Sequence, residues 1–64
     1  MAEAVRVARA FRTARRIEDA AEELGLGWRK TLRVLHSLES AGWTVNKTRI
    51  GRYIFWTVSG NPLR

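Results

Sequence analysis

The sequence has no cysteine, a single histidine and only six acidic residues among 64. Without cysteine the chain can form neither disulfides nor thiolate metal sites, which favours an intracellular protein. One histidine and scattered acids are too few ligands for a closed zinc site, and we expect no metal or other cofactor. No apolar run approaches the roughly 20 residues that a membrane span needs, so we expect no membrane insertion.

Catalytic residues are equally scarce. His36 is the only histidine, and it falls on the exposed face of a predicted helix. A nucleophile, a base and an orienting acid cannot be brought together around it. We therefore expect a binding protein rather than an enzyme.

Positive charge is what the sequence has in excess. Twelve Lys and Arg against six Asp and Glu give a net charge of +6. Four of the acids are clustered at Glu18, Asp19, Glu22 and Glu23, so the rest of the chain sets two acids against 12 basic residues. Such a surplus favours a polyanionic partner, most simply nucleic acid. The alternative is a well-solvated chain whose arginines reflect a GC-rich or thermophilic source.

The apolar period changes once along the chain. Spacing near 3.6 predicts helices over residues 2–14 and 17–24, and a third helix between Gly27 and Gly42. A glycine after the second and third helices is the expected stop signal. The order so far is helix, helix, tight turn, helix.

After residue 42 the period becomes 2, and aromatic and β-branched residues dominate. Two strands are therefore predicted, WTVNKT at residues 43–48 and RYIFWTV at 52–58, joined by a turn at 48–51. A short strand at about residues 15–17 could pair with this hairpin. The ending SGNPLR is typical of a frayed tail.

The stretch GWRKTLRVLHSLESAG, residues 27–42, predicts a helix with two different faces. The core side gathers Trp28, Thr31, Leu32, Val34, Leu35, Leu38 and Ala41. The other side gathers Arg29, Lys30, Arg33, His36, Ser37 and Ser40, and has no acid. A solvated helix face usually mixes both signs of charge. We therefore interpret the acid-free face as a candidate for contact with phosphates and base edges, with mere solvation as the alternative.

The runs IEDAAEELGLGWRKTLRVLHSLESAGW and NKTRIGRYIFWTVS together resemble the winged helix-turn-helix superfamily, found in many small bacterial and archaeal transcription regulators. The matching positions are Leu24-Gly25-Leu26, Leu35, Leu38, Gly42 and Gly51-Arg52. The resemblance covers about residues 5–59, and departs from the pattern at Gly27, Trp28 and Thr31. It implies an α+β fold of three helices followed by a two-stranded β-hairpin wing, in a domain of residues 1–60 with a C-terminal tail at 61–64.

The resemblance also implies how such a domain binds DNA, with the third helix in the major groove and the wing on the backbone or minor groove. The implied recognition face is Arg29, Lys30, Arg33, His36 and Ser37, and the implied wing is Asn46, Lys47, Thr48, Arg49 and Arg52. Arg15 and Arg16 precede the second helix, whose N-terminus often touches the DNA backbone, so phosphate contact and plain solvation are both open for them.

We therefore predict double-stranded DNA binding, by a small transcription regulator or an architectural DNA-coating protein, in the cytoplasm and associated with the nucleoid. The alternative is a winged helix that binds a protein or RNA through the outer face of its hairpin. Tyr53 and Phe55 alternate onto that face and are candidates for a homodimer or partner contact. Trp28, Trp43 and Trp56 are expected to pack on the core, with stacking on DNA as the alternative for Trp28.

Overall fold

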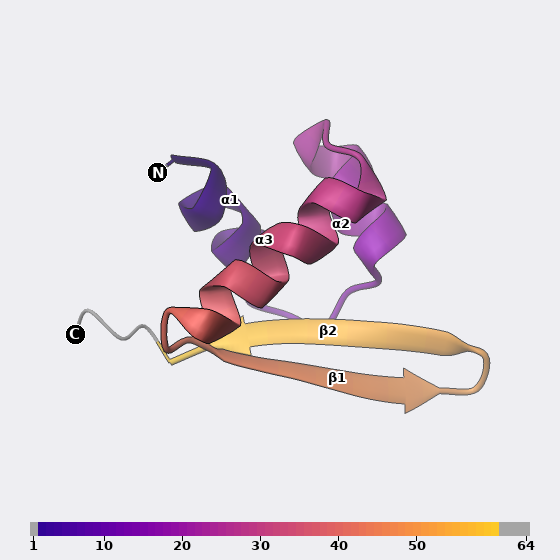
Figure 1. Cartoon of the computed structure of the whole chain (residues 1–64). Coiled ribbons are helices and arrows are strands. Elements are labelled where there is room, and N and C mark those ends of the chain that lie inside the picture. Colours follow the sequence, from indigo (N-terminus) through magenta and orange to yellow (C-terminus); the bar gives the residue numbers. More distant parts are fainter. Residues whose placement is uncertain (1, 61–64) are drawn as a thin grey trace.

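The computed structural model describes residues 2–60 and shows three helices packed on an antiparallel hairpin (Figure 1). The helices are α1 (Ala2–Ala10), α2 (Ile17–Leu24) and α3 (Trp28–Ser40), and the strands are β1 (Thr44–Ile50) and β2 (Tyr53–Ser59). This α+β order confirms the predicted fold class and is consistent with a winged helix. The predicted tail, residues 61–64, lies outside the described residues.

Both predicted helix stops are confirmed by the backbone. Gly25 follows α2 with a φ of 73°, a left-handed conformation that is costly for residues with a Cβ. The N–H of Leu26 then donates to the carbonyl of Ala21 at 2.9 Å. After α3, the N–H of Trp43 makes the equivalent bond to the carbonyl of Leu38 at 3.0 Å. Because only three residues separate α2 from α3, the two helices form a helix-turn-helix.

The first helix is shorter than the sequence predicts. α1 ends at Ala10 rather than at residue 14. The reason is a backbone contact with the hairpin, since the carbonyl of Phe11 accepts the N–H of Val58 at 2.9 Å. The chain therefore leaves the helix where its backbone can pair with β2, although the next residues are compatible with a helix.

The short strand that could pair with the hairpin at residues 15–17 is present only as one paired residue, Arg15. Arg15 and Trp56 exchange two backbone hydrogen bonds, of 3.1 and 2.7 Å, and form an isolated bridge. The pairing extends no further because Ile17 already begins α2. The named sheet therefore has two strands, and one residue of the α1–α2 connection caps the edge of β2.

The hairpin turn is tighter than predicted. β1 and β2 are paired as far as Ile50 and Tyr53, so the turn consists of Gly51 and Arg52. Gly51 has a φ of 64°, and a positive φ at the first of two turn residues is typical of a type II′ hairpin turn. The predicted turn at residues 48–51 is therefore wrong, and most of that segment extends β1.

The register of the hairpin separates its side chains into two faces, because directly paired residues share a face. Val58 is buried in the core, so its face is directed toward the helices. That face carries the pairs Val45–Val58, Lys47–Trp56 and Arg49–Ile54. The outer face carries the pairs Thr44–Ser59, Asn46–Thr57, Thr48–Phe55 and Ile50–Tyr53, and none of these eight residues is charged.

The core lies where the helices meet the near half of the hairpin. Its buried cluster is Val7, Ala8, Phe11, Ala20, Leu35, Leu38 and Val58. Thr31 is fully buried as well, and its hydroxyl donates to the carbonyl of Gly27 at 3.0 Å, so the polar atom is satisfied. The far half of the hairpin extends beyond the helices, and β1 is exposed from Asn46 onward (Figure 1).

Candidate nucleic-acid interface

The outer side of α3 presents two arginines to solvent. Arg29, Arg33, His36 and Ser37 are exposed and line one open depression along the helix. Within residues 2–60, neither arginine forms an ion pair with an acid. These four predicted residues are therefore brought together on one surface, and the two guanidinium groups there are available to an external anion.

Lys30, the fifth residue predicted for this face, lies elsewhere. Its Nζ is 3.3 Å from Oε2 of Glu3 in α1, and it does not line the depression. The sequence of α3 contains no acid on this face, but it gives no information about the carboxylate of Glu3, which α1 brings next to Lys30. Lys30 therefore connects two helices, and part of its charge is already compensated.

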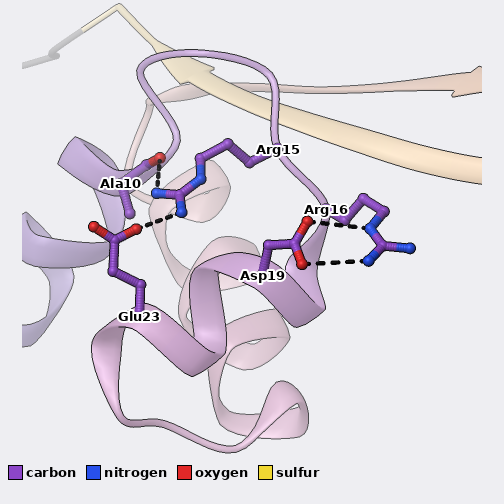
Figure 2. A network of polar contacts seen from close by, with 5 residues as sticks. All are labelled: Ala10, Arg15, Arg16, Asp19 and Glu23. Carbon is purple, nitrogen blue, oxygen red and sulfur yellow. Dashed lines mark hydrogen bonds and ion pairs between the residues drawn. The ribbon is translucent and has the colours of Figure 1, made fainter.

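The two arginines before α2 are held by acids of the same helix (Figure 2). Arg15 donates from Nη1 to the carbonyl of Ala10 at 3.3 Å, and its Nη2 pairs with Glu23. This half-buried side chain thus joins the end of α1 to α2. Of the two alternatives for Arg15, a structural role and contact with phosphate, these contacts favour the structural role.

Arg16 makes a two-pronged contact with Asp19, from Nε to Oδ2 at 3.2 Å and from Nη2 to Oδ1 at 3.3 Å (Figure 2). The hydrogen bond from Arg16 holds the pKa of Asp19 below its ordinary value, and the same bond raises the pKa of Arg16. A lowered carboxyl pKa stabilises the fold above its unfolded-state pKa, and this contribution is lost as the pH falls through the lowered value. At neutral pH the pair is therefore intact.

Arg16 also reaches the hairpin. Its guanidinium carbon lies 4.8 Å from the centroid of the Tyr53 ring. Tyr53 belongs by register to the outer face, yet its ring meets the residue that precedes α2. The predicted partner residue Tyr53 is therefore engaged within the chain, whereas Phe55 is half-buried next to Thr48 on the outer face.

The predicted wing residues are divided between the two hairpin faces. Lys47 and Arg49 lie on the face directed toward the helices, whereas Asn46 and Thr48 lie on the outer face. The Nζ of Lys47 is 5.4 Å from the centroid of the Trp56 ring, and the Nε of Arg49 donates to the carbonyl of Gly51 at 3.1 Å. Arg52, in the turn, is exposed. The basic residues therefore gather on the tip and on the helix-facing side.

Trp28 is the main residue that the sequence interpretation misplaced. It was expected on the core, but 55% of it is exposed. As the first residue of α3 it precedes the core position, which Thr31 occupies one turn later. Both Trp28 and Thr31 depart from the winged-helix pattern, which indicated that the large side chain and the buried position would not coincide here.

Trp28 contributes to a second hollow, between the start of α2, the first half of α3 and the far part of β2. Its apolar lining is Ile17, Trp28, Leu32, Tyr53, Ile54 and Trp56, and Arg16, Glu18 and Arg52 are the charged residues that border it. Leu32 and Trp28 also line the depression on α3, so the two hollows are adjacent and share these two side chains. The sequence analysis did not predict this apolar floor beside the cations. Its residues come from three elements, and they can be placed together only when the position of the hairpin turn and the register of the strands are known.

Comparison with protein-family models, with curated proteins and with solved structures finds no significant match to this chain. Within residues 2–60, no helix is both long and apolar enough to cross a membrane. The protein is an α+β domain of three helices and a hairpin, with basic residues on α3 and on the hairpin tip. Its function has to be inferred from this surface.

Proposed function

We propose that this chain is a winged-helix protein that binds double-stranded DNA, with α3 in the major groove and the hairpin tip on the backbone or minor groove. One observation carries the proposal. Arg29 and Arg33 line a depression that lies next to the hollow bordered by Arg52 of the hairpin, and Trp28 and Leu32 line both. The cations of the helix and of the wing thus flank one surface.

The dimensions of the elements support this mode of binding. α3 has 13 residues, which corresponds to a helix about 20 Å long, and a helix with its side chains fits the roughly 12 Å wide major groove. Arg29 and Arg33 would reach guanine O6 and N7 or phosphate oxygens, and the hairpin cations would contact phosphates. Most of the affinity would come from counterion release.

The biological role we propose is that of a small transcription regulator or an architectural DNA-coating protein, acting in the cytoplasm at the nucleoid. The basic surplus supports both roles, because either needs affinity for the DNA backbone. The role does not include catalysis.

A second candidate function is docking of a protein, including another copy of the chain, on the outer face of the hairpin. The supporting observation is that this face is uncharged throughout, although the chain carries +6. Ile50 at its end is 60% exposed. Loss of function on changing Phe55, with reversal of the α3 charges tolerated, would favour this function.

The test of DNA binding compares two charge reversals, Arg33→Glu and Arg12→Glu. Both residues are exposed, but Arg12 follows α1 and borders neither hollow of the interface. We expect Arg33→Glu to weaken binding to a random-sequence duplex more than about tenfold. Arg12→Glu changes only the overall charge and should cost less than about threefold. Fluorescence anisotropy measures both affinities, and circular dichroism verifies the fold.

Equal losses in the two variants would show that net charge alone drives binding and would remove α3 from the groove. Retained affinity in Arg33→Glu would have the same meaning. An absence of duplex binding by the unaltered chain at low salt would favour the outer hairpin face instead.

A further inference from the structure

The hollow between α2, α3 and β2 has an apolar floor of exposed aromatic and aliphatic side chains. It has a volume of about 410 Å³, which lies in the range of small-molecule pockets. Three of its residues, Trp28, Tyr53 and Ile54, are between 44 and 55% exposed. A duplex presents phosphates, sugars and the polar edges of its bases, whereas its flat apolar base faces are stacked out of reach. The hollow therefore fits a different part of the same polymer.

Each of the three aromatic rings of this hollow lies next to a cation. Arg16 is 4.8 Å from the ring centroid of Tyr53, Arg29 is 5.8 Å from that of Trp28, and Lys47 is 5.4 Å from that of Trp56. Proteins that hold single-stranded nucleic acid combine these two features, because bases stack on aromatic rings while cations follow the phosphates.

We propose that this hollow takes an unpaired nucleobase, so that the preferred substrate is DNA in which a duplex adjoins a single-stranded segment. The proposal rests on the proposed DNA binding and specifies its substrate. The base stacks on Trp28, the most exposed ring of the hollow, and its flanking phosphates meet Arg16, Arg29 and Arg52. The paired region remains on α3.

The charges around the hollow select against other occupants. A second copy of the chain brings a further +6 and meets two arginines at the rim, Arg16 and Arg52, with Arg29 beside them on Trp28. Among the residues that line the hollow, Glu18 is the acid, and it lies in the first turn of α2 close to Arg16. A carboxylate can accept a hydrogen bond from the exocyclic amino group of a base, so Glu18 is compatible with a base and adverse only to a phosphate placed beside it.

The experiment uses the full chain and three labelled DNA probes that share one duplex. The first probe is blunt, the second carries a single-stranded tail, and the third carries a tail of equal length made of abasic residues. The abasic tail keeps the phosphates and removes the bases, so it isolates stacking from charge. We expect the base-bearing tail to bind at least about tenfold more tightly than the abasic tail, as one or two stacked bases would give.

Trp28 is the residue to change, because it is exposed and its loss should leave the core intact. Trp28→Leu should abolish the difference between the two tails, whereas Trp28→Phe, which keeps an aromatic face, should retain most of it. The matched control is Phe55→Leu, which removes an aromatic ring from the opposite hairpin face and should change nothing. Circular dichroism confirms that each variant is folded.

Equal affinity for the two tails would overturn the proposal, and so would a tail preference that survives Trp28→Leu. In either case binding to the blunt probe still supports duplex recognition. Binding to the base-bearing tail with none to the blunt probe would support the base site and refute duplex recognition. Failure to bind all three probes would refute both.

Discussion

The basic side chains of the interface differ in how easily they could leave a carboxylate of the same chain and bind a phosphate instead. Arg29 and Arg33 have no carboxylate to leave, within the part of the chain that the structure describes. Arg16 contacts the exposed Asp19 and Lys30 the partly exposed Glu3, and an ion pair open to solvent is weak enough to be replaced by a stronger anion. Arg15 is half-buried between a carbonyl and Glu23, so its exchange would disturb the link from α1 to α2.

This ranking predicts that removing one particular acid tightens DNA binding. Asp19→Asn weakens the two-pronged contact of Arg16 and frees its guanidinium for phosphate. Glu22→Gln, on the same helix, removes an equal charge from an exposed acid with no ion-pair partner among residues 2–60. We expect Asp19→Asn to raise duplex affinity about threefold beyond the effect of Glu22→Gln at low salt. Equal gains in the two variants, measured by anisotropy, would assign Arg16 a purely structural role.

Features of a residue that depend on its neighbours in the chain could be predicted from the sequence, whereas contacts between residues far apart in the chain could not. The helix stop at Gly25 depends on neighbouring residues alone, and it was predicted correctly. The pair of Lys30 with Glu3 joins residues far apart in the chain, and no periodicity contains that information. Trp28 was misplaced because a helix wheel gives the direction of a side chain, but not whether anything covers it there.

The elements of the interface differ in how they are held. α3 is fixed by its buried side, including Leu35 and Leu38, so its outer residues have a defined position. The hairpin is held at its near half by Val58 and by the bridge from Arg15 to Trp56, and near its tip the contact of Tyr53 with Arg16 joins it to the start of α2. The helix therefore suits the reading of bases, which needs fixed geometry, and the wing suits the contact with phosphates.

This division of labour leads to a prediction about Lys47. Lys47→Ala should weaken binding to duplexes of unrelated sequence by the same factor, because a phosphate contact carries no base information. The slope of log affinity against log salt should also become shallower by about 1. Lys47→Arg keeps the charge and should restore both quantities. A loss confined to some sequences would instead mean that the wing reads bases.

The order of helices and strands could be predicted because the apolar period changes from 3.6 to 2 near Gly42. The residues at which these elements end were predicted less accurately. α1 ends early and the hairpin turn is short for the same reason. Both boundaries are decided by backbone pairing with β2, through Phe11 at one and through Ile50 and Tyr53 at the other. The side chains near these boundaries are compatible with either conformation.

The whole molecule is a thin basic body, with extents of 34 × 23 × 16 Å. A chain of 64 residues has a stability of only about 3–10 kcal/mol, so a bound polyanion would add appreciably to it. The hollows on α3 and beside β2 form one surface on which cations outnumber acids, while the outer hairpin face is uncharged. Only the net charge, and not this separation, could be obtained from composition.

Salt dependence of duplex binding is the first measurement to make on this protein, because it reports how many phosphates the surface neutralises. In the proposed mode of binding, phosphates would be neutralised by six basic residues of α3, the hairpin and the start of α2, namely Arg16, Arg29, Arg33, Lys47, Arg49 and Arg52. An anisotropy titration of the unaltered chain against random duplex, repeated from low to physiological salt, should therefore give a slope of log affinity against log salt of about −5. A slope shallower than about −2, or no binding at low salt, would contradict the assignment of this surface to double-stranded DNA.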